Sequence, residues 1–223
     1  MSLLLNHPVL TVRIHAGLNA ASVLAGLAGL MRSPFFSLTE LAREKFPALT
    51  SDVELVDSHV NGIAGVTCRI ACPAPAGHVH RSVADIARMM DESTLSAAAR
   101  EKADAVWQVL AKAEASVHGA SPDKVHFHEV GAVDSIVDIT AAAVCLDNLG
   151  IEDVIVPVLY EGTGSIRCAH GVLPIPVPAV VNIAAAEHLN LHITGAKGEY
   201  VTPTGAAIAA AVRTSDQLPA EFT

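Results

Sequence analysis

The pattern of hydrophobic and polar positions predicts a chain in which strands and helices alternate. Apolar residues at helical spacing, bounded by capping or breaking residues, predict helices, and short runs rich in β-branched residues predict strands. The predicted helices span residues 18–31, 37–45, 83–91, 97–117, 133–148, 179–188 and 203–212. The predicted strands span residues 9–14, 52–57, 65–71, 125–129, 154–159 and 191–193. This order predicts a mixed α/β fold, built as one compact domain or two closely packed small ones.

Glycine and proline mark the expected connections between these elements. Asn61-Gly62 is a turn-forming pair between two predicted strands, and Gly119 is expected to end the long helix before it. Residues 162–178 contain repeated glycine and proline and are predicted to be irregular. The linker Pro73 to Gly77 divides the chain into an N-terminal α/β region, residues 1–77, and a core, residues 78–223.

Composition narrows the classes of protein that this chain can represent. Hydrophobic residues make up 51% and charged residues only 17%, which excludes a disordered chain. The formal charge of −9 without a basic tract argues against a nucleic-acid partner. The start has no basic region typical of a signal peptide, and prolines interrupt the longest apolar stretch, residues 172–186, so no membrane partner is expected. The 4 cysteines form no CxxC pair, which favours reduced thiols and a cytoplasmic location.

The 11 histidines are the one compositional excess and point to metal binding. His126 and His128 share one face if residues 125–129 are extended, and two imidazoles on one face make half of a metal site. Asp134 and Asp138 are one helical turn apart on the following helix. Imidazole with carboxylate suits nickel, zinc or cobalt. The alternative is that these histidines are ordinary edge-strand residues and that the aspartates cap or solvate the helix.

Other histidines carry weaker signals. His78 and His80 form a second His-x-His pair in a polar loop, where histidines are often only solvated. Cys168 and His170 repeat the same alternation with a thiol and an imidazole. His118, next to Gly119, is expected to be a helix C-terminal residue favoured by the helix dipole.

The segment Thr202-Pro203-Thr204-Gly205 is the best candidate anion site in the sequence. A helix start offers free backbone N–H groups, and here two hydroxyls accompany them, so a phosphate or carboxylate can be held. The alternative is that the same residues serve only to begin a helix, which they do well.

Four ordered blocks of sequence resemble the LarC-type family of nickel-insertion proteins. These blocks are AEASVHG at residues 113–119, HFHEVGAVDSIVD at 126–138, CAHGVLPIPVPA at 168–179 and GEYVTPTGAA at 198–207. The resemblance covers about residues 83–211, so the predicted core matches the family and the N-terminal region diverges from it. Such long blocks are more specific than any spacing argument.

This resemblance implies an enzyme, a nickel chelatase or insertase of the lyase type. Its substrate would be pyridinium-3,5-bisthiocarboxylic acid mononucleotide, and its product the nickel-pincer nucleotide of lactate racemase-like enzymes, with Ni²⁺ bound to two sulfurs and one ring carbon. CTP with Mn²⁺ or Mg²⁺ would take part. The implied nickel-handling residues are His126, His128 and His170, with His78 and His80. Glu129, Asp134 and Asp138 would be catalytic, and Thr202, Thr204 and Gly205 would hold the substrate phosphate.

Two departures from the family pattern leave alternatives open. The family's Ser-Gly-Ile-Ser-Gly-Asp-Met type motif corresponds here to residues 14–22, which lack both aspartates. The family's C-terminal nucleotide-binding region is not present in these 223 residues, so either a separate C-terminal chain supplies it as a partner or CTP-dependent insertion has been lost. The alternatives are a non-catalytic nickel-binding or delivery protein and a degenerate nucleotide-holding scaffold. A homo-oligomer is compatible with each of these functions.

Overall fold

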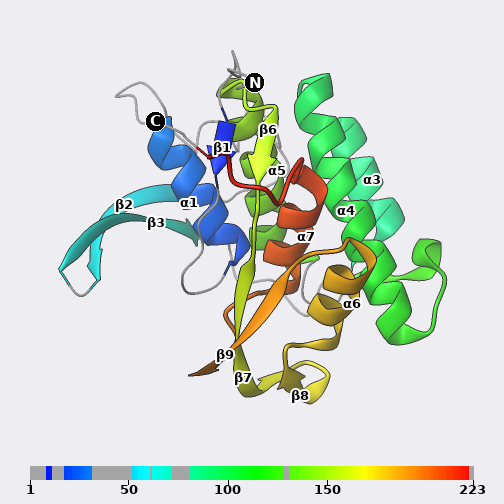
Figure 1. Cartoon of the computed structure of the whole chain (residues 1–223). Coiled ribbons are helices and arrows are strands. Elements are labelled where there is room, and N and C mark those ends of the chain that lie inside the picture. Colours follow the sequence, from blue (N-terminus) through cyan, green and yellow to red (C-terminus); the bar gives the residue numbers. More distant parts are fainter. Residues whose placement is uncertain are drawn as a thin grey trace.

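The computed structural model describes residues 9–11, 18–31, 52–60, 62–71, 81–127 and 131–220, and it confirms a mixed α/β fold (Figure 1). The helices are α1 (Ala20–Leu30), α3 (Val83–Glu92), α4 (Ala97–His118), α5 (Val133–Asn148), α6 (Pro178–Ala186) and α7 (Pro203–Val212), with a short 3-10 turn, η1 (Pro122–Lys124). The strands are β1 (Val9–Thr11), β2 (Asp52–Val60), β3 (Ile63–Ala71), β4 (Arg81–Ser82), β5 (His126–Phe127), β6 (Asp153–Ile155), β7 (Leu159–Cys168), β8 (Gly171–Ile175) and β9 (Leu191–Lys197).

Helix α5 runs through the centre of the core. Every residue from Ile136 to Leu146 is buried, which is the pattern of a helix surrounded by protein rather than lying on a surface. Helices α1 and α4 both pack on α5, and α4 also contacts α6 and α7. Figure 1 shows α3 and α4 on the side of the molecule opposite to α1. Residues on both sides of the predicted boundary at residue 77 contribute to this core, and the boundary itself stays a prediction.

Strand β7 is the middle strand of a small sheet with the order β8-β7-β9. It pairs antiparallel with β8 and parallel with β9. Strand β1 pairs in parallel with β6, so a segment near the start of the chain joins one near the middle. No helix in the described part of the chain is long and apolar enough to cross a membrane.

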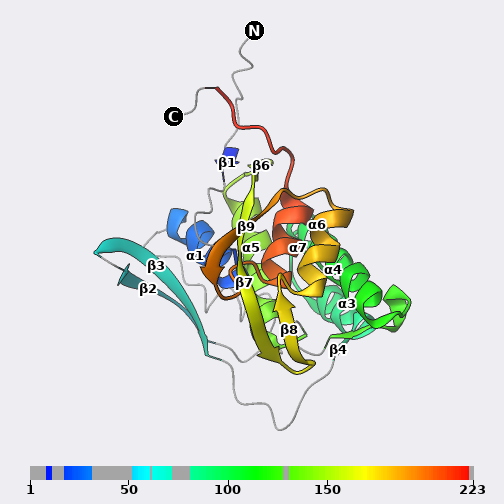
Figure 2. The ribbon, with the colours of Figure 1, turned by 60° about the horizontal axis from the view of Figure 1, so that its bottom comes forward.

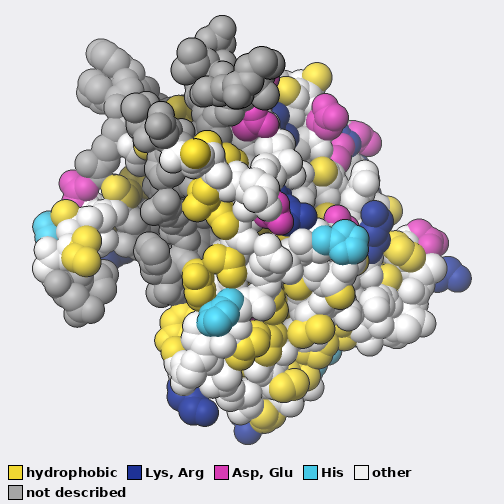
Figure 3. Space-filling model, viewed as in Figure 1, with side chains coloured by type: hydrophobic (Ala, Val, Ile, Leu, Met, Phe, Trp, Pro, Cys, Tyr) yellow, Lys and Arg dark blue, Asp and Glu magenta, His cyan; other side chains and the backbone are white. Residues whose placement is uncertain are grey.

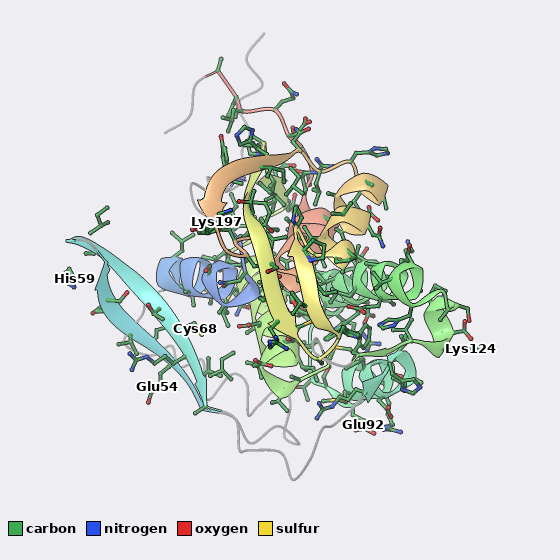
Figure 4. The ribbon with its side chains drawn as sticks, turned by 90° about the horizontal axis from the view of Figure 1, so that it is seen from below. Glu54, His59, Cys68, Glu92, Lys124 and Lys197 are labelled. Carbon is green, nitrogen blue, oxygen red and sulfur yellow. The ribbon has the colours of Figure 1, made fainter. Side chains whose placement is uncertain are left out.

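Strands β2 and β3 form an antiparallel hairpin that extends away from the rest of the molecule beside α1 (Figure 2). The hairpin confirms the two strands predicted on either side of Asn61-Gly62, and Gly62 has a φ of +80° in the turn. Val53 and Cys68 are buried on one face of it. Figure 4 shows His59 toward the outer part of the hairpin.

Local chemistry explains where several helices begin and end. The Ser82 hydroxyl accepts from the Asp85 backbone N–H, and the Asp85 carboxylate accepts from the Ser82 N–H, which makes a complete capping box at the start of α3. Gly119 ends α4 in the left-handed conformation, with a φ of +62°, as its sequence position predicts.

The prediction that residues 162–178 are irregular is wrong, because β7 and β8 form a regular hairpin there. Pro174 fits within β8 because β8 is an edge strand, where a missing N–H costs no ladder hydrogen bond. Gly162 is needed because a side-chain carbon there would lie 2.1 Å from the Gly198 carbonyl oxygen. Glycine and proline in this stretch therefore serve close strand packing and an edge position, not irregular backbone.

The remaining element predictions have mixed outcomes. The predicted strand 154–159 is two strands, β6 and the start of β7, separated at residues 156–158. The predicted strand 191–193 continues to Lys197. In the extended segment predicted over 125–129, β5 covers His126 and Phe127, Val125 is not in a strand, and residues 128 and 129 lie outside the described residues. The helix predicted over residues 37–45 lies outside the described residues.

Candidate functional site

Two helix starts are held side by side by one short bridge. Leu18 and Val201 form a parallel β-bridge in which the Leu18 N–H donates to Tyr200 O at 2.7 Å and the Thr202 N–H donates to Leu18 O at 3.1 Å. The next residue on each side is a helix N-cap. The Asn19 side chain accepts from the Ser22 N–H of α1, and the Thr202 hydroxyl accepts from the Gly205 N–H of α7. The positive ends of α1 and α7 are therefore brought to the same place.

A buried carboxylate fixes this arrangement. Glu161 is fully buried on β7, and its Oε1 accepts from the Gly162 N–H at 2.6 Å and from the Tyr200 N–H at 2.7 Å. Its Oε2 accepts from the Val201 N–H at 3.2 Å. Three backbone donors satisfy a charge that would otherwise be costly to bury. Glu161 therefore sets the backbone just before Thr202 rather than taking part in chemistry.

A cavity of about 560 Å³ lies against these helix starts. It is walled by residues from α1, α4, α5, the β7–β8 hairpin, the start of α6 and the start of α7. Its polar and ionisable lining residues are Asn19, Glu114, His118, Ser135, Asp138, Cys168, His170, Glu199, Thr202 and Thr204. Apolar residues such as Val117, Ile166 and Leu173 complete the walls. A concave site with a few polar groups among apolar walls is the usual form of a small-molecule site.

Two histidines meet at one end of this cavity. His118 is the last residue of α4, and His170 lies in the turn between β7 and β8. Their ring centroids are 5.1 Å apart, with the rings tilted by 48°. Glu114, one turn earlier on α4, places its Oε2 3.3 Å from Nε2 of His118. Imidazoles, a carboxylate and the thiol of Cys168 therefore share one cavity, and these are donor types that suit nickel.

Asp138 is the buried acid of the cavity. Its side chain lies on α5 and is only 7% exposed, and its Oδ1 has no hydrogen-bond partner among the described residues. Burial, as the larger cause, and the nearby charge of Asp134 together raise the pKa of Asp138 to about 7. The sequence prediction that these two aspartates lie on one side of the helix agrees with this coupling. An acid that titrates near neutral pH can accept or release a proton during a reaction.

The structure places the predicted anion-binding residues at different depths. Thr202 and Thr204 line the cavity, and the Thr204 side chain is buried. Gly205 is also buried, but it packs against the backbone of Leu18, where an added side-chain carbon would lie 2.1 Å from the carbonyl oxygen. The first turn of α7 faces the cavity through its two threonines, while Gly205 allows the close approach of α7 to the α1 start.

The predicted metal residues are not all gathered at one place. His170 lines the cavity, whereas His126 is exposed on β5 and is not among the described lining residues, and neither is Asp134. His78, His80, His128 and Glu129 lie outside the described residues. Within the described ranges, no group of three or more His, Cys, Asp or Glu side chains is close enough to hold a metal ion by itself.

The glycine of the His-Phe-His-Glu-Val-Gly segment has a structural explanation. A side-chain carbon at Gly131 would lie 2.8 Å from the Phe127 carbonyl oxygen and 2.9 Å from its Cβ. The Arg81 guanidinium donates a hydrogen bond to the Gly131 carbonyl. Phe127 itself is buried and packs against Trp107, with ring centroids 5.4 Å apart. Phe127 and Gly131 of this segment therefore anchor the chain just before α5.

Sequence reasoning named none of five polar cavity residues as site residues: Asn19, Glu114, His118, Ser135 and Glu199. His118 was interpreted only as a helix C-terminal residue, and that position is confirmed. Its partner His170 is far away in sequence, so no local spacing pairs them. The one available signal was helical: Glu114 and His118 are four residues apart and must share a face of α4. The segment that departs from the family pattern also reaches the cavity, because Asn19, Ala20 and Ala21 line it.

Comparison with known proteins agrees with the sequence resemblance. The family model described as nickel insertion protein matches residues 10–223. A protein of Alkaliphilus metalliredigens named pyridinium-3,5-bisthiocarboxylic acid mononucleotide nickel insertion protein is 58% identical over 147 residues, which cover 66% of this chain and 35% of the relative. A protein of Akkermansia muciniphila with the same name is 44% identical over 135 residues, covering 60% and 33%.

A putative nickel insertion protein of Geotalea daltonii is 46% identical over 178 residues, which cover 79% of this chain and 44% of the relative. The aligned part of the chain thus spans less than half the length of each of these curated relatives. No solved structure gives a significant match. The family model covers nearly the whole chain, including both helix starts at the cavity, and the chain therefore belongs to the nickel insertion protein family.

Proposed function

We propose that this chain takes part in nickel insertion into pyridinium-3,5-bisthiocarboxylic acid mononucleotide and that the cavity is where insertion occurs. Two relatives carry that substrate in their names. The observation that carries the proposal is the joint lining of one cavity by metal-type donors, His118, His170 and Cys168, and by a capped helix start at Thr202. The donor side chains suit a metal ion, and the helix start suits the phosphate of a nucleotide.

The mononucleotide would bind with its phosphate at the start of α7. The first turn of a helix offers backbone N–H groups and the positive end of the helix dipole, both of which favour a phosphate. The hydroxyls of Thr202 and Thr204 lie at this end of the cavity. The volume of about 560 Å³ is within the usual range of small-molecule sites. The pyridinium ring and its two thiocarboxylates would then extend toward the histidines.

Asp138 would act as the base of the reaction. In the expected product, nickel is bound to two sulfurs and one ring carbon, so that carbon must release its proton when the nickel–carbon bond forms. The electron pair of the carbon–hydrogen bond passes to the new bond, and the proton goes to the Asp138 carboxylate. A base works best when its pKa is near the working pH, and the pKa of Asp138, about 7, meets this condition. Asp134 and Glu129 stay predicted catalytic residues.

We also propose the lyase-type, CTP-linked form of the reaction, with Mn²⁺ or Mg²⁺ as the accessory ion. The support for this is the family membership and the resemblance of the four sequence blocks. The described cavity assigns no separate place to CTP. An assay of the proposed function therefore supplies the C-terminal region of a competent relative as a second chain, together with CTP and the divalent ion.

The test is a reconstituted insertion assay that follows nickelated nucleotide by mass spectrometry. Precursor, Ni²⁺, CTP, Mn²⁺ and the relative's C-terminal region should yield product only when this chain is added. Asp138→Asn should bind precursor but lower product formation at least about tenfold, because the amide cannot take the proton. The matched variant Asp123→Asn, at an exposed position of η1 that does not line the cavity, should retain most activity. Absence of product with a C-terminal region shown to be active elsewhere would contradict the proposal.

A second candidate is a non-catalytic nickel-delivery protein. It is favoured by one observation: the cavity wall formed by Asn19, Ala20 and Ala21 carries no carboxylate, in the segment where the family pattern has aspartates. Nickel that is bound by this chain and passed to an acceptor, with the nucleotide unchanged, would support delivery. Nickelated nucleotide formed on this chain would exclude it.

A further inference from the structure

We infer that His118 and His170 form an open two-imidazole site that receives the nickel ion at one end of the cavity. The inference rests on the proposed function for the identity of the cargo and adds the place where the ion is held. It keeps His170 from the sequence prediction, which named it together with His126, His128, His78 and His80, and it adds His118 as the second ligand. The two sets of ligands differ and can be separated by experiment.

The separation of the two rings is that of imidazoles sharing one ion. With metal–nitrogen bonds of about 2.0–2.1 Å and a ligand–metal–ligand angle of about 90–110°, two imidazole centroids lie about 4.5–5.2 Å apart. The observed separation of the His118 and His170 centroids is 5.1 Å. Each side chain comes from a firmly placed element, the end of the long helix α4 and a tight two-residue turn between β7 and β8. The separation of the two rings is therefore compatible with both of them binding one ion.

Glu114 prepares His118 for this role. Its Oε2 lies 3.3 Å from Nε2 of His118, where it stabilises a proton on that nitrogen. Metal-bound histidines commonly donate their second ring N–H to a carboxylate, which fixes the tautomer and makes the imidazole a better ligand. Glu114 is thus a positioning residue. The C-terminal end of α4, where His118 lies, also carries the negative end of the helix dipole and favours a cation.

Within the described part of the chain, the site has fewer than three protein ligands, which are too few to retain the ion. Among the described residues, no third His, Cys, Asp or Glu side chain completes a closed group around a metal. Sites that exchange a ligand keep open positions in this way, whereas structural sites are closed. The open positions face the cavity and would be taken by the sulfurs of the bound substrate. Such a site holds nickel long enough to be met by the substrate and loosely enough to release it.

The experiment is a calorimetric titration of the full chain with Ni²⁺ alone. Wild type should bind one ion per chain, and His118→Ala and His170→Ala should each weaken binding at least about tenfold. Glu114→Gln keeps a hydrogen-bond partner but loses the charge, and it should weaken binding less than His118→Ala does. His59→Ala and His192→Ala remove exposed histidines outside the cavity, and they should bind as wild type does. Figure 4 shows how far His59 lies from the body of the molecule.

Co²⁺ provides a second probe that does not depend on affinity. Its visible absorption bands should change when the ion moves from water to two imidazoles, and both cavity variants should lose this change while retaining the wild-type circular dichroism spectrum. Unchanged Ni²⁺ binding in His118→Ala and His170→Ala would overturn the inference. So would loss of binding in His126→Ala alone.

The outcomes for the site and for the function are separable. Binding at the pair without any nucleotide product would support the site and contradict insertion. Product formed at the wild-type rate by the double variant His118→Ala, His170→Ala would support insertion and overturn the site.

Discussion

The carbonyl oxygen of Leu18 lies so close to Gly205 that a side-chain carbon at position 205 would be 2.1 Å from it. This contact joins the residue before α1 to the first turn of α7. The cavity is bounded on one side by these two helix starts, so its shape depends on a glycine that has no room for a methyl group. Figure 3 shows hydrophobic side chains exposed over the lower middle of one face of the molecule.

We expect Gly205→Ala to destabilise the chain strongly. The added methyl group meets backbone at Leu18 and Asn19, which cannot turn aside as a flexible side chain can. Overpacking of this kind costs about 1–3 kcal/mol or more, measurable by urea denaturation. The matched control is Gly26→Ala in α1, where the new carbon meets nothing within 4 Å. In a helix that change should raise stability by about 0.5–1 kcal/mol. Equal effects of the two substitutions would contradict the packing explanation.

Glu161→Gln should also destabilise the chain. In the wild type, three backbone N–H groups donate to the two carboxylate oxygens of Glu161. In the variant, an NH₂ group replaces one of these oxygens, so at least one buried N–H donor loses its acceptor. The expected loss is about 2–4 kcal/mol in the free energy of unfolding. Glu152→Gln, at an exposed position, should change stability by less than about 0.5 kcal/mol. If Glu161→Gln proved neutral, the three donors would need other acceptors.

Asp138 should make stability depend on pH in an unusual direction. Its pKa is about 7 in the folded chain and near 3.8 when exposed, so between these values the folded state binds more protons than the unfolded state. Stability therefore falls as pH rises through this window. Wild type should lose on the order of 2–4 kcal/mol relative to Asp138→Asn between pH 4 and pH 8.

Asp134→Asn serves as the control for this effect. Removing the Asp134 charge should lower the pKa of Asp138 and reduce the pH dependence without abolishing it, since burial is the larger cause. Urea denaturation at several pH values would measure all three proteins. A wild-type stability that rises relative to Asp138→Asn over the same range would show that Asp138 is not held protonated.

Thr202→Ala should weaken both the α7 start and the binding of the substrate phosphate. The hydroxyl caps the Gly205 N–H at 3.1 Å, and loss of such a cap costs about 0.5–2 kcal/mol. Thr202→Ser keeps the hydroxyl and should restore most of the stability. In the insertion assay, Thr202→Ala should raise the KM for the nucleotide more than it lowers kcat. An unchanged KM would place the phosphate elsewhere.

Local sequence patterns predicted much of the secondary structure. The helices over residues 97–117, 133–148 and 203–212 were predicted within about one residue of their observed ends, because caps such as Ser96, Gly119 and Thr202 act within a single turn. The β7–β8 hairpin was missed for the opposite reason. Its glycines and Pro174 satisfy requirements set by neighbouring strands, and these are not visible in the segment itself.

The sequence by itself determined the family, through four long blocks, and it identified His170, Asp138 and Thr202 as residues of interest. Only the tertiary structure brought these three residues into one cavity and added Glu114, His118 and Asn19 to it. The physical reason is that a site made by helix ends and turns is assembled by packing. The Leu18–Val201 bridge joins segments that are more than a hundred residues apart, and Glu161 joins β7 to backbone that lies several elements later. The periodicity of residues along the chain does not predict such contacts.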